Sequence, residues 1–448
     1  MSMKSNRNIS STTRIEPLEA RTMLSGSTIS DFQLASGKGA GALAVVEDSA
    51  DNLFVAATAN DAAGVSHALV NEFVRRADGS VGPATTVVDF NLSQYASSGW
   101  TSEFSDLLID PATGDLYAAG QSKDAAGISH WVLVKRDATG SVSTVEDYQY
   151  PGGSYTAALG ITRDAAGNIF VAGEADTTIV VKHTSSTISH WIVRELKANT
   201  SAWVAAEDFT YQGQSTYARD IIAAPSGLYV TGFGGGHWLT RRGAADAAGN
   251  IVWATVDDFK ADPNYSSLAQ GLGTDANGNV YSLGTAVKSN CLSGKQAGSV
   301  QEWTVRRTSN GGGSWLTIDS ARGAGSGTAA AQGFGSDASG NLYAVGYLPG
   351  SDNSAHQVVR TLGINDSSWA TLDDWQLAPG HGAFGSGLLA DHAGSVYAVG
   401  NANDAANIRH AIVRRIDTPA SAGNALFSLT PVTAFSVDQR SDLNDLLS

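Results

Sequence analysis

Histidine, the side chain best suited to bind a metal ion or move a proton near neutral pH, recurs at one position along this 448-residue chain. Six of the nine histidines open one repeated phrase, as in His130-Trp131 and His190-Trp191. Equivalent positions in a repeat protein lie a full repeat apart, too far to share one ion. We therefore expect a structural role between repeats and no metal site. The six are His67, His130, His190, His237, His356 and His410.

Tryptophan and arginine follow the same periodicity. Eight of the ten tryptophans fall at two repeated positions, which predicts packing between repeats because large aromatic rings bury much area. They are Trp131, Trp191, Trp238 and Trp303, and then Trp203, Trp253, Trp315 and Trp369. The periodic arginines are expected to form surface ion pairs with a repeated Asp of a neighbouring outer strand. They are Arg136, Arg194, Arg241, Arg306, Arg360 and Arg414.

Few residues outside these repeated positions indicate catalysis. The single cysteine, Cys291, lies in a polar stretch and excludes an internal disulfide. A glycosidase or lyase would need two carboxyl groups about 5 to 10 Å apart. Glu103, Asp106 and Asp220 are candidates near the starts of strands, but the sequence does not show that they converge. We assign no catalytic residues and expect no cofactor.

The element that positions these residues is a repeated strand–turn–strand unit. One copy reads Asp164-Ala-Ala-Gly-Asn168-Ile-Phe170-Val-Ala-Gly173, and seven copies recur at intervals of about fifty to sixty residues. Gly and Asn suit a hairpin turn, whereas a calcium loop would need more oxygen ligands. Each unit holds four short runs of half-buried type. This predicts an all-β, seven-bladed β-propeller of four-stranded blades.

The two ends of the repeat region suggest how the ring closes. The phrase of the fourth strand also precedes the first unit, at 29–34, and a weaker copy follows the last, at 432–437. We expect the N-terminal copy to complete the last blade, since closure removes exposed strand edges. The domains are then an N-terminal segment at 1–27 without fixed structure, the propeller at 28–437 and a C-terminal tail at 438–448.

Composition excludes several classes of partner. The formal net charge is −15 and no basic run is present, which disfavours nucleic acid and anionic membrane surfaces. No apolar stretch approaches the length of a transmembrane segment, and the first 30 residues lack the apolar core of a signal peptide. We expect a monomer.

Three stretches resemble known families. The Asp-x-x-Gly-Asn phrase resembles the seven-bladed β-propeller repeats (SBBP repeats) of bacterial surface proteins. The run at 308–315, with Asn310 before Trp315, is similar to the Asp-box, a structural turn of sialidase propellers, although the sialidase arginine triad is not recognisable. Residues 14–25 resemble the LEPR-XLL motif, which implies an extracellular or cell-envelope location in bacteria.

The predicted function is a non-enzymatic binding or scaffolding module for a polysaccharide or another envelope protein. Loops that lead into the inner strands should gather near the channel mouth, where their aromatic side chains could stack on sugars. The competing interpretation is that these side chains wedge between blades. A polysaccharide-active enzyme and a structural spacer remain the alternatives. The candidate ligand-binding residues are Tyr95, Trp100, Tyr155, Tyr217, Tyr265 and His381.

Overall fold

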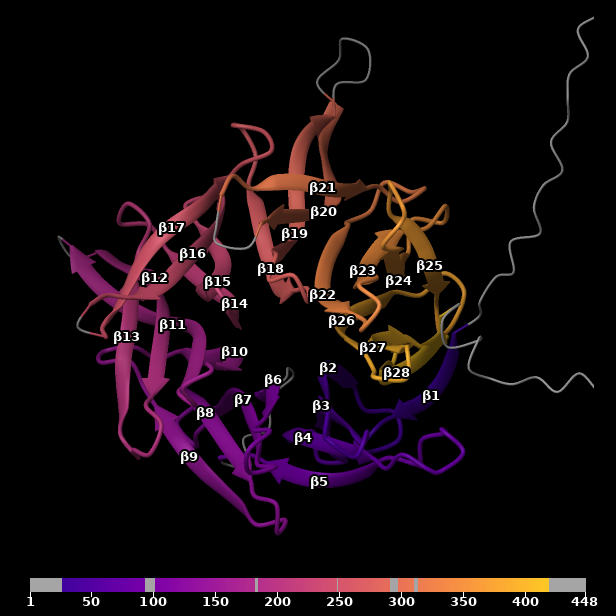
Figure 1. The fold of residues 1–448 in the computed structure, drawn as a ribbon, viewed down its shortest axis with the longest axis horizontal. Helices are drawn as coiled ribbons and strands as arrows, with labels where there is room; N and C mark the ends of the chain where they lie inside the picture. The colour runs from indigo at the N-terminus through magenta and orange to yellow at the C-terminus, as the bar shows by residue number, and fades with distance from the viewer. Residues whose placement is uncertain are drawn as a thin grey trace, which may run out of the picture.

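A ring of seven antiparallel sheets makes up the protein (Figure 1). The structure, a computed structural model, describes residues 26–92, 101–181, 184–247, 249–290, 297–309 and 313–418. Within these ranges it contains 28 strands, four to each sheet. The predicted all-β, seven-bladed β-propeller is therefore confirmed. No helix in the described part of the chain is long and apolar enough to cross a membrane.

The first four blades follow chain order from the inner to the outer strand. Blade 1 comprises β2 (Ala40–Glu47), β3 (Leu53–Asn60), β4 (Ser66–Phe73) and β5 (Thr85–Phe90). Blade 2 comprises β6 (Ser102–Ile109), β7 (Leu116–Lys123), β8 (Ser129–Arg136) and β9 (Val142–Tyr148). Blade 3 comprises β10 (Thr156–Arg163), β11 (Ile169–Val181), β12 (Thr184–Leu196) and β13 (Trp203–Phe209). Blade 4 comprises β14 (Thr216–Ala224), β15 (Gly227–Gly234), β16 (His237–Ala245) and β17 (Ile251–Phe259).

The last three blades include the point where the ring closes. Blade 5 comprises β18 (Ser267–Thr274), β19 (Val280–Asn290), β20 (Ala297–Thr308) and β21 (Leu316–Ala321). Blade 6 comprises β22 (Ala330–Ser336), β23 (Leu342–Pro349), β24 (Ala355–Leu362) and β25 (Ala370–Trp375). Blade 7 comprises β26 (Ala383–Ala390), β27 (Ser395–Asn403) and β28 (Arg409–Asp417), with β1 (Ser27–Phe32) as its outer strand.

The N-terminal strand closes the ring, as the sequence predicted. β1 pairs antiparallel with β28, with Asp31 opposite Ile412 and Phe32 opposite Ala411. The edge of β28 is thereby covered by a strand from the other end of the chain. The weaker copy at 432–437, the LEPR-XLL-like segment and Cys291 lie outside the described residues, as does Asn310 of the Asp-box-like turn.

The repeated Asp and Asn of each phrase build its hairpin turn. In blade 3 the Asp164 carboxylate accepts hydrogen bonds from the backbone N–H of Asn168 at 2.9 Å and from its side chain at 2.8 Å. The side-chain oxygen Oδ1 of Asn168 then accepts the N–H of Ala198, from the loop after the third strand. The phrase therefore ties two loops of one blade together, which explains its repetition.

The glycine that ends each phrase makes room for two neighbours. A Cβ on Gly173 would lie 1.9 Å from the carbonyl oxygen of Ala157 in the adjacent inner strand. It would also lie 2.8 Å from the ring of Trp131 in the preceding blade. Trp131 is fully buried, so the repeated tryptophan of one blade packs against the repeated glycine of the next. This confirms packing between blades for that tryptophan position.

Each repeated histidine forms its ion pair within its own blade and not between blades as predicted, although the rings of His190 and His237 also pack on tyrosines in the connection from the preceding blade. The Nδ1 of His130 lies 2.6 Å from the carboxylate of Asp147, and that of His237 lies 2.6 Å from Asp258. Each pair joins the start of a third strand to the end of the fourth strand beside it. The antiparallel register sets these ends opposite each other, which sequence periodicity alone does not reveal.

Five of the six repeated arginines, all except Arg136, form largely buried ion pairs with the neighbouring blade, but their partner is the acid one position before the expected one. Arg306 Nε donates to Asp257 at 2.7 Å, and both side chains are less than 9% exposed. The expected partner was the next residue, Asp258, which instead binds His237. Alternation along the strand explains the difference, because adjacent side chains point to opposite faces. Arg306 also lies 3.9 Å above the ring of Phe259.

The interface between blades 1 and 2 replaces this ion pair with an apolar pair. The residues at the two equivalent positions are Val88 and Val134, which are 3% and 1% exposed and belong to one hydrophobic cluster. Arg136, which the sequence grouped with the other arginines, lies two residues further along β8 and is not equivalent to them. The same interface position thus accepts an ion pair or two valines.

Candidate functional site: the channel mouth over blades 2 to 4

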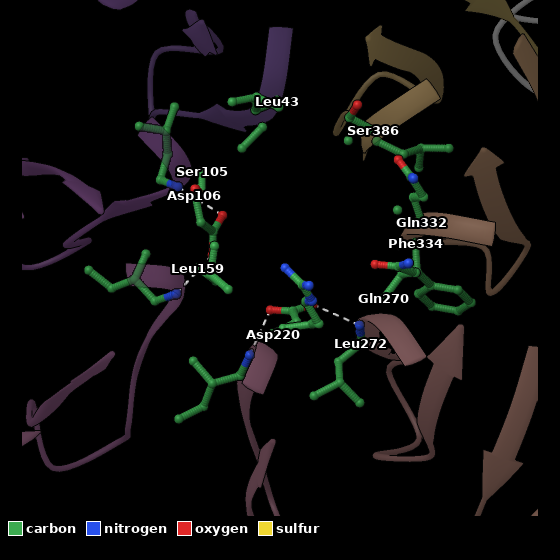
Figure 2. Close-up of a pocket in the computed structure, with 18 of the residues that line it drawn as sticks. Leu43, Ser105, Asp106, Leu159, Asp220, Gln270, Leu272, Gln332, Phe334 and Ser386 are labelled. Atoms are coloured by element: carbon green, nitrogen blue, oxygen red, sulfur yellow. Dashed lines mark hydrogen bonds between the residues drawn. The ribbon is translucent and has the colours of Figure 1, made fainter. Parts of the chain in front are cut away.

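A cavity of about 280 Å³ lies on the ring axis and is lined by the inner strands (Figure 2). Every inner strand has an irregularity in its pairing with the second strand, as between Phe104 and Asp106 and between Ala218 and Asp220. The residue skipped by the pairing lines the cavity. Across the seven blades these residues are Leu43, Ser105, Leu159, Arg219, Gln270, Gln332 and Ser386.

Two aspartates line this cavity and fasten neighbouring inner strands. Asp106 accepts the backbone N–H of Ile161 in the next blade at 2.9 Å, and Asp220 accepts that of Leu272 at 2.7 Å (Figure 2). The second oxygen of each accepts the N–H of the following residue. Burial raises the pKa of both, and the charge of Asp106 raises that of Asp220 further. Their hydrogen bonds support a structural role.

A second polar cluster, here called the mouth cluster, lies at the end of the channel where the inner strands of blades 2 to 4 begin. Glu103 of β6 accepts a hydrogen bond from Gln121 at 2.8 Å. Tyr155, just before β10, lies beside the carboxylate of Glu174 on β11. The guanidinium of Arg219 on β14 interacts with both glutamates. Three consecutive blades therefore contribute to one cluster.

Burial determines the protonation of this cluster. It raises the pKa of Glu103 and of Glu174, and the nearby Arg219 charge offsets only part of that effect. Burial and the two glutamates raise the pKa of Tyr155 strongly, so its hydroxyl stays protonated. Glu174 is only 6% exposed. Its Oε2 and the Nε of Arg219 have no hydrogen-bond partner among the described residues. Both atoms are also closed to solvent, so the cluster holds buried polar groups whose hydrogen bonding is incomplete.

Aromatic rings lie at the corresponding positions of neighbouring blades. Tyr217 stacks on Phe233 with ring centres 5.9 Å apart, and Arg219 lies 5.8 Å from the Tyr217 ring. On blades 6 and 7, Tyr347 and Phe384 meet edge to face at 5.0 Å. All four side chains are partly exposed. One rim of the channel thus combines aromatic surface with the polar cluster.

The structure brings together two of the six residues that the sequence selected. Tyr155 and Tyr217 both lie beside Arg219. Tyr265 instead points to the β19–β20 hairpin, where its hydroxyl lies 3.5 Å from the carbonyl oxygen of Gly298. His381 contacts Asn407 in the β27–β28 turn at 2.9 Å. Tyr95 and Trp100 lie outside the described residues. A binding role stays a prediction for all six.

Sequence reasoning missed Arg219 and Glu174 as members of this cluster. A signal was present for Glu174, because it follows the repeated glycine at a position where other blades carry neutral residues such as Thr58 and Thr285. A charged residue at a position where the other repeats carry neutral residues indicates a function specific to that blade. Of the three carboxylates named from the sequence, Glu103 belongs to the cluster, whereas Asp106 and Asp220 bind backbone N–H groups of the inner strands.

Comparison with known proteins supports the fold and no narrower assignment. No protein-family model and no curated protein sequence matches the chain. A solved ulvan lyase, described as a new family of polysaccharide lyase, aligns at 12% identity over 82% of this chain and 93% of its own, with a TM-score of 0.51. The polysaccharide lyase Uly1 aligns at 11% identity, covering 84% and 89%, with a TM-score of 0.46. The α-L-arabinofuranosidase Arb93A of Fusarium graminearum aligns at 9%, covering 88% and 98%, also at 0.46.

Proposed function

We propose that this propeller binds a polysaccharide at the channel mouth over blades 2 to 4. The observation that carries the proposal is the position of Arg219, next to two tyrosines, Tyr155 and Tyr217, and two buried carboxylates. Sugars are bound by aromatic faces that cover their C–H groups and by polar groups that bond their hydroxyls. This rim supplies both, on strands of a rigid ring.

The charge of the cluster indicates the class of polymer. Glu103 and Glu174 place two carboxylates against the one guanidinium of Arg219, and Asp106 and Asp220 lie deeper in the channel. A uronate or sulfate group would meet four acidic groups and, among the described residues of this cluster, the single guanidinium of Arg219. We therefore propose a neutral polysaccharide. The extracellular or cell-envelope location inferred from residues 14–25 would bring the protein to such polymers.

Retention on immobilised polysaccharides tests the proposal. The full chain is passed over matched panels of neutral, uronate-rich and sulfated polymers, and retention on a neutral polymer is expected. Tyr217→Ala and Arg219→Ala should each weaken it about tenfold or more. Leu316→Ala is the control, because that exposed side chain lies on β21, an outer strand away from the channel mouth, and it should leave retention unchanged. Absence of retention on every polymer would contradict the proposal.

A second candidate, hydrolysis of the bound polymer, is favoured by one observation. Both Glu103 and Glu174 have raised pKa values and interact with the same arginine. Glycoside hydrolysis uses one protonated and one ionised carboxyl group, and burial that raises a carboxyl pKa favours the protonated partner.

Release of reducing ends distinguishes this candidate from binding alone. If the protein is a hydrolase, Glu174→Gln should retain binding and reduce turnover by about 100-fold or more. If wild-type protein retains a polymer but releases no reducing ends from it, the binding proposal stands and the enzymatic one is wrong.

A further inference from the structure

A histidine and two carboxylates meet at the other end of the inner strands, away from the mouth. Glu47 ends β2, Asp51 lies in the β2–β3 turn, and His392 lies in the β26–β27 turn of blade 7. Glu47 Oε2 lies 3.1 Å from His392 Nδ1, and His392 Nδ1 lies 3.6 Å from Asp51 Oδ1. The three atoms all lie within 4.8 Å of one another. His392 is not one of the repeated histidines, all of which pair within their own blades.

These separations suit a shared metal ion. Nitrogen and oxygen ligands lie about 2.0 to 2.2 Å from a transition metal, so neighbouring ligands in a tetrahedral or octahedral site stand about 3.0 to 3.6 Å apart. The two measured separations that involve His392 fall within this range. One imidazole and two carboxylates form a donor set typical of divalent transition metals, with the remaining positions filled by water.

Glu47 supplies an independent sign that a ligand is needed. Its side chain is only 5% exposed, and its Oε1 accepts no hydrogen bond from any described residue. Its Oε1 lies 3.7 Å from Arg75 Nη2 and its Oε2 lies 3.1 Å from His392 Nδ1, so a cation bound at Oε2 would add to the stabilisation of this buried carboxylate.

The nearby cation does not fill this role. Arg75 donates to Asp391 at 2.9 Å and to the hydroxyl of Tyr397 at 2.7 Å, while its distance to Glu47 Oε1 is 3.7 Å. The carboxylates of Glu47, Asp51 and Asp391 against the one guanidinium of Arg75 leave a formal charge of −2. The remaining acid of this turn, Asp48, accepts the N–H groups of Ala50 and Asn52.

We propose that Glu47, Asp51 and His392 bind a divalent transition-metal ion of the zinc class. The ion would join blade 1 to blade 7, the blade that β1 completes. His392 is 79% exposed, so solvent and ions reach the site directly. The site is independent of the mouth, and its presence does not depend on polysaccharide binding.

Calorimetric titration of the chelator-treated, untagged full chain tests this site, with Zn²⁺, Mn²⁺ and Ca²⁺ as probes. We expect one Zn²⁺ per chain, weaker binding of Ca²⁺ because of the imidazole ligand, and a higher melting temperature with Zn²⁺. His392→Ala and Asp51→Asn should each weaken Zn²⁺ binding about tenfold or more. His237→Ala removes a histidine that pairs with a single carboxylate and should leave the affinity unchanged.

Two results would overturn the proposal. One is an absence of heat and of any melting-temperature change at roughly 1 mM Zn²⁺, far above the range of a specific site. The other is wild-type affinity in His392→Ala. Because His392 is largely exposed, this variant should fold normally, and its melting temperature without metal provides that control.

Discussion

Residues that obey the repeat and residues that depart from it have different tasks in this protein. The repeated glycine, histidine and arginine build blades and their interfaces, as Gly173, His237 and Arg306 show. Glu174 and Arg219 interrupt the pattern and converge at the mouth. A seven-fold repeat can create one site only by breaking its own symmetry, so the departures are the residues to test first.

The channel aspartates predict how stability depends on pH. Burial raises the pKa of Asp106 from 3.8 to about 7, so the folded protein binds more protons than the unfolded chain between these values. The free energy of unfolding should therefore fall as pH rises from about 4 to 7. In Asp106→Asn the decrease in the free energy of unfolding between these pH values should be smaller by on the order of 1 to 3 kcal/mol. Urea denaturation from pH 4.5 to 8 measures it, and an unchanged slope would contradict this assignment.

At the scale of the blade, each interface ion pair joins the outer strand of one blade to the third strand of the next blade. Arg306 lies between Asp257 and the ring of Phe259, both from the preceding blade. Val88 and Val134 fill the equivalent space between blades 1 and 2. Two opposite charges or two apolar side chains can both be buried at this interface, whereas one buried charge without its partner is destabilising.

Single and double substitutions at one interface test this equivalence. Asp257→Val leaves the Arg306 guanidinium buried without its carboxylate, which should cost about 3 to 5 kcal/mol. The double variant Asp257→Val with Arg306→Val recreates the pair found between blades 1 and 2 and should recover most of that loss. Chemical denaturation of the wild type, the two single variants Asp257→Val and Arg306→Val, and the double variant gives the coupling energy. Additive losses in the double variant would show that the two positions act independently.

The strands and blades were predictable because the phrase is periodic and its turns have a specific chemistry. The details of pairing were not, as Asp257 and Asp258 show: one binds the neighbouring blade and the other binds its own. Strand register decides which of two adjacent acids faces which way, and it depends on contacts between distant segments. The mouth cluster was missed in part for the same reason, since Glu103, Glu174 and Arg219 come from three blades.

At the scale of the whole molecule, the ring depends on β1 from the opposite end of the chain. Deleting residues 1–34 removes this strand and exposes the edge of β28, including the pairs at Asp31 and Phe32. We expect a lower melting temperature and concentration-dependent aggregation, measured by thermal unfolding and light scattering. A chain that lacks only residues 1–25 keeps β1 and should behave as wild type. Equal stability of the two truncations would show that β1 does not hold the ring together.

Hydrogen exchange with and without an oligosaccharide of the retained polymer tests the central claim most directly. The account predicts slower exchange at the starts of β6, β10 and β14 and around Glu174 in the middle of β11, where the mouth cluster lies. The strand ends near Glu47 and His392, on the opposite face, should be unaffected. Protection confined to that opposite face, or to blades 5 to 7, would contradict a binding site over blades 2 to 4.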